Sequence, residues 1–418
     1  MTQRIELNQV IEAAPARVVL TRDGSGRVVR AAFDLAGLPR VDALLTGRPV
    51  LEIPGLVEHL CGICPTAHHL AGMRALEALA GLAGVPPTAE AVRRLLHHAG
   101  IVSTHLVGFV VTDQEDALVL RRFAKAVMAA TGSPGHFPVT AVPGGVAAPV
   151  AVAQRDACRA LVAEALAAAR HIAERALARP GVPDAFDGAD VALVDATGRL
   201  DLFGETLRAV AADGQALITA GADRWDELVA EADPGSPTPR PYLVALGQAA
   251  GAYRVGPVAQ LRVGPLGTPV AARLQDAWRQ GNGGAAAARG VIMVHCVEAI
   301  GQLLERPEVV DGTSAAPWPD ALPAGAGAGL VDSARGLLVH RYATKGDGLV
   351  SSATILTPTA QNEPWLGDLL RGAADGTAAR EGIEDAIREA DPCLPCSTVP
   401  AGTMDLVVDT VPADGGRG

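Results

Sequence analysis

The sequence has no block of basic residues, no apolar leader and no uninterrupted hydrophobic run of membrane length. Its formal net charge of −11 argues against nucleic acid and anionic membranes as partners. The N-terminus is charged from Arg4 onward and lacks the apolar region of a signal peptide. The longest apolar passage, which starts at Ala141, is broken by proline and glycine and is too short to span a bilayer. We therefore expect a cytoplasmic protein without a membrane span, although export alongside a signal-bearing partner stays open.

Cysteine is also scarce, with six residues in 418, which is too few for a disulfide framework. Two of them, Cys158 and Cys296, stand alone in helical patterns, where the expected role is that of a small buried apolar residue. The other four form two C-x-x-C pairs, Cys61 with Cys64 and Cys393 with Cys396. In a cytosolic protein this pattern indicates metal or redox chemistry.

The rest of the composition is that of a globular chain, with 49% hydrophobic and 19% charged residues. Residues 17–35 predict a β-hairpin around a turn at Asp23–Gly26. Amphipathic patterns predict long helices, with Thr88 as the N-cap of the second; they cover residues 68–84, 86–111, 155–181 and 286–308. Short strand-like runs occupy 183–260, further strands follow from 330, and a helix covers 380–390. We expect an α+β fold, mainly α, with a large helical-bundle body and peripheral hairpins and small sheets.

The expected domain organisation is a single domain over residues 1–418. Its successive parts are an N-terminal hairpin region (1–56), a helical core (57–182), a mixed α/β part (183–260), a helical and β core that carries the last cysteine pair (261–399) and a tail (400–418). Two glycine-rich stretches, 24–26 and 323–329, do not fit a dinucleotide-binding fingerprint and are expected to be plain turns.

The two cysteine pairs are far apart in sequence. Cys64 and Cys393 are 329 positions apart (393 − 64), whereas zinc ribbons place their pairs roughly 15–20 residues apart. The leading interpretation is one four-thiolate site that joins both ends of the chain. Because soft thiolates bind zinc, copper(I), iron–sulfur clusters or nickel, the ligand set alone does not name the metal.

The residues around the pairs are more specific. "CGICPTAHH" (61–69) and "DPCLPC" (391–396) resemble the first and last motifs, C-G-x-C-x-x-x-H and D-P-C-x-x-C, of the large subunit of nickel–iron hydrogenases. The resemblance continues, in the family's order, through 47–56, 252–261, 332–342 and 360–365. It therefore covers nearly the whole chain.

The resemblance implies a catalytic subunit for H2 ⇌ 2H⁺ + 2e⁻. Cys61 and Cys393 would bind nickel terminally, and Cys64 and Cys396 would bridge nickel to an iron that also carries carbonyl and cyanide ligands. Splitting H2 also needs a base for the proton, which a bridging thiolate or a guanidine can supply.

The resemblance also implies roles for residues around the metals. Arg335 would lie over the nickel and pair with Asp391, which Pro392 biases to extended geometry. His68 would orient a bridging cysteine by a hydrogen bond. The family's proton-gate glutamate would be Glu12, with Glu6 as the alternative. No chemistry is assigned to the remaining histidines of these segments, which are His69, His97, His98, His105 and His340.

Some positions depart from the family pattern. His59 stands where an arginine is usual, Ala334 replaces a proline, and Val399 replaces a histidine that marks tail cleavage and helps to hold magnesium. Asp42 stands where the family often has a carboxylate for that ion. The tail, 400–418, is therefore retained or processed differently; if it is retained, residues 404–408 should add a strand or fill a groove.

The implied partners are an iron–sulfur small subunit, further subunits that reduce NAD(P) or another carrier, and maturation factors. The branch most similar to this chain is the cytoplasmic, cofactor-coupled one. Two alternatives stay open. One is a divergent H2 sensor or catalytically weak paralogue, supported by the departures at His59, Ala334 and Val399; the other is a structural four-thiolate zinc protein.

Overall fold

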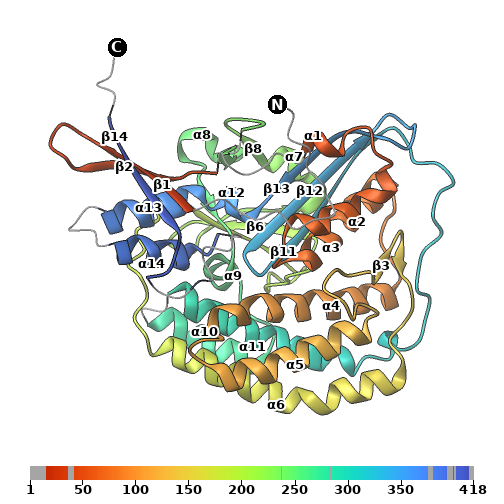
Figure 1. The fold of residues 1–418 in the computed structure, drawn as a ribbon. Helices are drawn as coiled ribbons and strands as arrows, with labels where there is room; N and C mark the ends of the chain where they lie inside the picture. Colours follow the sequence, from red (N-terminus) through yellow and green to blue (C-terminus); the bar gives the residue numbers. More distant parts are fainter. Residues whose placement is uncertain are drawn as a thin grey trace.

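The computed structural model describes residues 16–35, 42–236, 238–281, 284–374, 380–392, 399 and 402–413. A body of helices carries small sheets at its sides (Figure 1). This arrangement confirms the expected α+β class with mainly α content.

The helical body is built around α11 (Ala285–Leu304), which packs against α6 (Val152–Leu177), α4 (Pro87–His105) and α10 (Pro269–Gln280), while α5 (Gln114–Ala130) packs on α4 and α6. Close packing is possible because α11 carries small residues. A Cβ atom at Gly290 would lie 2.9 Å from the Cα of Ala173. Among the described helices α11 alone is long and apolar enough to cross a membrane, but 78% of that window is buried inside the protein, as expected of a core helix.

A three-stranded sheet, β11 (Gly325–Ser333), β12 (Gly336–Thr344) and β13 (Val350–Leu356), packs against α3 (Pro65–Leu79). The prediction of a plain turn at 323–329 is wrong, because most of this stretch belongs to β11. Cβ atoms at Gly327 and Gly329 would lie only 2.2 Å from backbone atoms of α3. These glycines therefore allow the strand to contact the helix backbone directly, and no helix that could bind a dinucleotide follows β11.

The predicted hairpin is present as β1 (Ala16–Arg22) and β2 (Val28–Phe33), joined by a turn at Asp23. The tail forms β14 (Leu406–Pro412), which pairs with β1 in parallel. The prediction that the apolar part of the tail adds a strand is thus confirmed. Figure 1 shows β1 and β14, the first and last described strands, side by side in this sheet, next to α13 (Glu363–Ala374) and α14 (Arg380–Ala390).

The mixed region forms a sheet in the order β10-β5-β6-β7 and a pair, β8-β9.

Thr88 is not the N-cap of α4; Pro86 has that position, and the Thr88 hydroxyl donates instead to the carbonyl of Asp311. The further elements are α1 (Asp42–Leu45), η1 (Val50–Glu52), α2 (Ile53–Val57), η2 (Glu58–Leu60), η3 (Leu106–Phe109), β3 (Ala141–Val142), β4 (Gly145–Val146), β5 (Ala189–Val194), β6 (Thr206–Val210), β7 (Ala216–Gly221), η4 (Ala222–Arg224), α7 (Trp225–Leu228), β8 (Val229–Glu231), β9 (Pro241–Leu243), η5 (Val244–Leu246), α8 (Gly247–Ala250), β10 (Tyr253–Arg254), α9 (Pro257–Val263), η6 (Pro307–Val309) and α12 (Pro358–Gln361).

Candidate metal centre

The first cysteine pair lies where η2 ends and α3 begins. Cys61 has extended backbone geometry and Cys64 is the N-cap of α3, with Pro65 at the first helical position. Proline suits that position because its ring presets φ and no backbone N–H is needed there. A cysteine at a helix N-terminus has its thiolate stabilised by the helix dipole and by free N–H groups. The local sequence therefore places a cysteine where a metal ligand is favoured.

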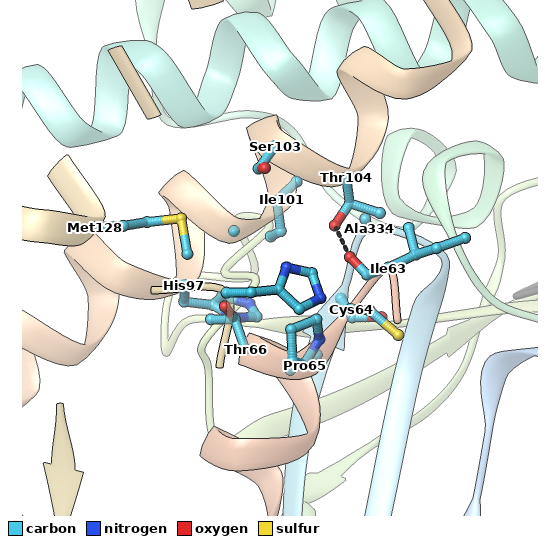
Figure 2. Close-up of a pocket in the computed structure, with 14 residues that line it drawn as sticks. Ile63, Cys64, Pro65, Thr66, His97, Ile101, Ser103, Thr104, Met128 and Ala334 are labelled. Atoms are coloured by element: carbon cyan, nitrogen blue, oxygen red, sulfur yellow. Dashed lines mark hydrogen bonds between the residues drawn. The ribbon is translucent and has the colours of Figure 1, made fainter. Parts of the chain in front are cut away.

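The two cysteines face each other. Their Cα atoms are 5.4 Å apart and their sulfur atoms are paired as a disulfide, so the pair must be reduced before it can bind a metal. The backbone N–H of Cys64 donates to the Cys61 sulfur over 3.1 Å. Between them, the carbonyl of Ile63 accepts a hydrogen bond from Thr104 of α4 over 3.2 Å (Figure 2). This hydrogen bond holds the loop to α4. In the resulting loop conformation the two cysteine sulfurs lie close together, as two ligands of one metal would.

His68 lies one turn into α3 and is buried. A ring nitrogen of His68 and the two cysteine sulfurs lie within 4.8 Å of one another. Burial lowers the pKa of His68 to about 4, so the ring is neutral at pH 7. Its Nδ1 lies 3.0 Å from Nε2 of His340. His68 therefore lies beside the cysteines, and its role there stays a prediction.

Arg335 lies in the two-residue turn between β11 and β12. The turn is closed by a hydrogen bond of 2.7 Å from the Ser333 hydroxyl to the carbonyl of Gly336. The Arg335 side chain is buried, and its Nη2 donates to Oδ1 of Asp391 over 3.1 Å. The expected pair of Arg335 with Asp391 is therefore confirmed, across 56 positions of sequence.

Asp391 differs from expectation in its backbone. Its φ is 48°, in the left-handed region rather than the extended region that the following proline favours. The reason is the end of α14: the N–H of Asp391 still bonds the carbonyl of Ile387 over 2.9 Å, and a left-handed residue is a common way to end a helix. This turn points the carboxylate at Arg335 and places Oδ2 3.9 Å from Arg289 of α11.

The two motifs converge through shared neighbours. One pocket is lined by Cys64 and Ala334, and another by Ala334, Arg335 and Asp391. His105, next to Thr104, is buried, and its pKa is lowered to about 3, mainly by burial and further by the charges of Arg289 and Arg335. Residues from the N-terminal third and the last thirty residues therefore gather around Ala334.

Several predicted site residues lie outside the described part of the chain. Cys393 and Cys396 directly follow Pro392, and Glu6 and Glu12 precede β1; none of these four is described. α1 begins at Asp42, but the side chain of Asp42 is not described. The roles assigned to these residues stay predictions.

Comparison with known proteins points to the nickel-dependent hydrogenases. Residues 40–112 match the family model of the nickel-dependent hydrogenases. One chain of the F420-non-reducing hydrogenase vhu of Methanococcus voltae is 28% identical over 86% of this chain and 95% of its own length. The beta chain of the NAD-reducing hydrogenase HoxS of Cupriavidus necator is 27% identical over 96% and 95%. A crystal structure of an NAD⁺-reducing [NiFe]-hydrogenase has a TM-score of 0.79 and 29% identity, with 90% of this chain and 95% of that one covered. Over nearly its whole length the chain is similar to hydrogenases of the nickel-dependent family.

The family fold extends to more distant members. A [NiFeSe] hydrogenase from Desulfovibrio vulgaris Hildenborough has a TM-score of 0.67 at 18% identity, which speaks for the fold alone. The family resemblance predicted from the two cysteine motifs is confirmed by these comparisons, and nickel and iron are the metals that fit this family.

The described residues fit a metal of this family. They offer two cysteine sulfurs at a helix N-terminus, a neutral histidine beside them, and a buried arginine held by a carboxylate. Soft sulfur ligands are those that nickel and iron take in such centres. His59, where the family usually has an arginine, stacks on Phe137 with ring centroids 4.0 Å apart and lies outside this group.

Sequence reasoning missed three contributors. Arg289 donates to the carbonyls of Arg388 and Glu389 at 2.7 and 2.8 Å, so it holds the end of α14 in place. His340 and Tyr342 of β12 line up behind His68. His340 and Tyr342 lie two positions apart on β12, on either side of the less buried Arg341, and this spacing is the local signal that could have paired them. Nothing in the local sequence marks Arg289.

Proposed function

We propose that this chain is the large, catalytic subunit of a cytoplasmic nickel–iron hydrogenase that splits H2 reversibly into protons and electrons. The observation that supports this most directly is the ion pair of Arg335 with Asp391, two residues before the second cysteine pair and beside a pocket that shares Ala334 with the pocket of Cys64. A structural zinc site has no use for a buried arginine at this place.

The four cysteines would hold the metals, with Cys61 and Cys393 terminal on nickel and Cys64 and Cys396 bridging to an iron with carbonyl and cyanide ligands. When bound, this centre supplies the site at which H2 is polarised and its electrons are accepted. The residues of the chain supply the rest. Arg335 presents a planar cation toward the metals because Asp391 holds its other face. A cysteine thiolate is the base nearest the metals, and Asp391 can pass a proton outward.

Electrons must leave through a partner, because outside the two C-x-x-C pairs the sequence has only Cys158 and Cys296, which cannot hold an iron–sulfur cluster. We assign that role to an iron–sulfur small subunit, with further NAD(P)- or other carrier-reducing subunits. Exposed valines follow two residues that contact the first motif or its flank. Val139 comes two residues after Phe137, which stacks on His59, and Val107, Val110 and Val111 come soon after Thr104, which bonds the Ile63 carbonyl. An apolar rim of this kind suits a permanent subunit interface.

A magnesium ion near Asp42 has the least support, because Val399 offers no side-chain ligand where the family has histidine. The carbonyl of Val399 instead lies 3.5 Å from Nη2 of Arg388. Maturation factors that insert the metals would act before the tail reaches its final place.

The test is H2-dependent reduction of an artificial electron acceptor by the full chain, co-expressed with maturation factors and a small subunit, with metals measured on the same sample. Nickel and iron in near-equal amounts together with turnover support the proposal. Both metals without turnover favour the H2-sensor alternative, and zinc alone removes the hydrogenase. Cys61→Ala should abolish metal retention, whereas the matched variant Cys158→Ala, at a lone cysteine of α6, should retain it.

A further inference from the structure

Three buried side chains form a continuous hydrogen-bonded chain behind the cysteine pair. Nδ1 of His68 lies 3.0 Å from Nε2 of His340, and Nδ1 of His340 lies 2.6 Å from the hydroxyl of Tyr342. His68 belongs to α3, and the other two belong to β12 on the sheet that packs against α3. His68 is 4% exposed, and His340 and Tyr342 are fully buried.

The hydrogen bonds of this chain can run in either of two directions, depending on which ring nitrogens carry protons. The Tyr342 hydroxyl decides between the two. A phenolic hydroxyl has one proton to donate, and a buried donor without an acceptor is unfavourable. Within the described residues the Tyr342 hydroxyl forms no hydrogen bond other than that with His340. A Cβ atom at Gly72 of α3 would lie 3.0 Å from the hydroxyl oxygen, so the packing on that side leaves no space for a water molecule. The hydroxyl therefore donates to Nδ1 of His340.

The remaining protons follow by hydrogen-bond accounting. Since Nδ1 of His340 accepts, the neutral ring has its proton on Nε2 and donates to Nδ1 of His68. Since Nδ1 of His68 accepts, the His68 proton is on Nε2, the ring nitrogen that is left for the cysteine side. Burial lowers the pKa of both histidines, to about 4 for His68, which agrees with two neutral rings.

We propose that Tyr342 and His340 are positioning residues that fix His68 in its Nε2–H tautomer, the form in which His68 can make the hydrogen bond to a cysteine sulfur that the family resemblance implies. The role of the sulfur as a metal ligand rests on the proposed function, whereas the tautomer assignment does not.

The reverse direction gives a different centre. If Nε2 of His68 bound a metal, Nδ1 would have to carry the proton and donate to His340, and Nδ1 of His340 would then donate to the Tyr342 oxygen. The Tyr342 proton would be left buried without an acceptor. Cys61, Cys64 and His68 are close enough to act as three ligands of one ion, and the direction set by Tyr342 argues against that use. A thiolate that accepts an N–H bond instead gives less electron density to its metal, which is how outer partners tune such centres.

The tautomer is measured by long-range ¹H–¹⁵N correlation NMR on the reduced, metal-free full chain labelled at histidine. His68→Gln and His340→Gln identify the two rings by loss of their signals. We expect both rings as the Nε2–H form. In Tyr342→Phe the donor that orders the chain is gone, and His68 should show a mixture of tautomers. A wild-type His68 with its proton on Nδ1, or a Tyr342→Phe protein with unchanged His68 signals, overturns the assignment.

A matched pair of variants separates positioning from packing. Tyr253 is also fully buried and donates one hydroxyl hydrogen bond, to Gln361 over 3.1 Å, so Tyr253→Phe makes the same change in another core. On metal-loaded protein, Tyr342→Phe should lower nickel retention or H2 turnover by about 10-fold or more, and Tyr253→Phe should stay within about twofold of wild type. Equal losses in both variants would reduce Tyr342 to a packing role. A chain without nickel, iron and turnover would contradict the proposed function, while the NMR result on the metal-free chain would still decide the tautomer.

Discussion

Arg335 depends on residues from three distant segments. The two-residue turn between β11 and β12 presents it, Asp391 at the end of α14 pairs with it, and Arg289 of α11 holds that end. A buried guanidinium is tolerated only when its charge is paired and its N–H donors point at acceptors. The orientation toward the metals that we propose for Arg335 therefore depends on the planar fork of donors as much as on the charge.

Arg335→Lys should retain both metals but lower H2 turnover by at least ~100-fold, the lower range for positioned acid–base groups. An ammonium on a flexible chain cannot bond Asp391 and at the same time present a planar face to the metals. Turnover assays and metal analysis of one preparation check this. Arg94→Lys is the control, because Arg94 also forms a bidentate pair, with Asp201, away from the centre. Turnover within about threefold of wild type in Arg335→Lys would show that Arg335 does not face the metals.

Cys64→Ser and Cys396→Ser should each abolish metal retention together with H2 turnover. A bridging thiolate serves two metals, and a hydroxyl is a much poorer ligand for soft metals. Nickel and iron content by elemental analysis is the measurement, with Cys158→Ser as the cysteine control. Full nickel occupancy and normal activity in either bridging variant would refute the ligand assignment.

At the residue scale, the sequence predicted the candidate site residues better than it predicted the residues that position them. The first cysteine pair, Arg335 and Asp391 are visible in the sequence because each stands in a short recognisable motif, whereas the roles of Cys393 and Cys396 stay predictions. The sequence does not reveal the left-handed backbone of Asp391 or the hydrogen bonds by which Arg289 holds the end of α14. Both depend on how α14 ends against α11. Local preference for extended geometry before proline was outweighed by a helix end fixed from another segment.

Among the elements, the tail strand has the clearest consequence. β14 pairs with β1 over seven residues, Met404 and Leu406 are buried, and Arg380 of α14 donates to the carbonyls of both. The N–H of Gly402 donates to Glu384 over 2.8 Å. The tail is thus a packed strand of the fold.

We predict that protein matured without a specialised protease keeps residues 400–418 and is partly deficient in nickel, because the continuous chain restrains the segment of Cys396. Intact-mass spectrometry under denaturing conditions is required, since a cut tail would stay bound through β14. The expected mass is that of all 418 residues. A mass that ends at Val399 in nickel-loaded protein would show that the Val399–Pro400 bond is cut, and the sensor alternative would lose its main support.

The fate of individual elements shows what sequence patterns contain. The valines of the tail predicted a strand but not its partner, because the partner strand β1 lies near the other end of the sequence. The ion pair of Arg17 with Asp409, for example, joins residues 392 positions apart. The glycines of 323–329 suggested a turn because glycine has no side chain to mark a strand. Their actual role, contact with the backbone of α3, depends on a helix some 250 residues earlier.

Over the whole molecule, buried histidine is the unusual feature. Six of the ten histidines have a lowered pKa, in each case with burial as the largest cause: His68, His97, His98, His105, His295 and His340. A folded-state pKa below the unfolded value of about 6.5 means that unfolding takes up protons as the pH falls. The stability that these groups contribute is present above pH 6.5 and is lost as the pH falls toward 4. Asp332, whose pKa burial raises to about 7, has the opposite sign, as do Glu363 and Glu389, whose pKa burial also raises. These are three groups against six.

The free energy of unfolding should therefore fall steeply between pH 6.5 and 4, with each histidine contributing up to about 1.4 kcal/mol per pH unit. Urea denaturation at a series of pH values gives the slope. His295→Gln, at a ring with pKa about 4, should make it shallower, whereas His171→Gln, at an exposed histidine, should leave it unchanged. A flat profile over this range in the wild type would contradict the burial of neutral histidines.

The central claim is that the two ends of the chain meet at a nickel–iron centre. Infrared spectroscopy of the purified, metal-loaded chain tests it most directly, because carbonyl and cyanide bound to iron absorb where protein groups do not. We predict one carbonyl band with cyanide bands beside it in the wild type, lost in both Cys64→Ser and Cys396→Ser. A wild-type protein that contains metal but shows neither kind of band would contradict the account.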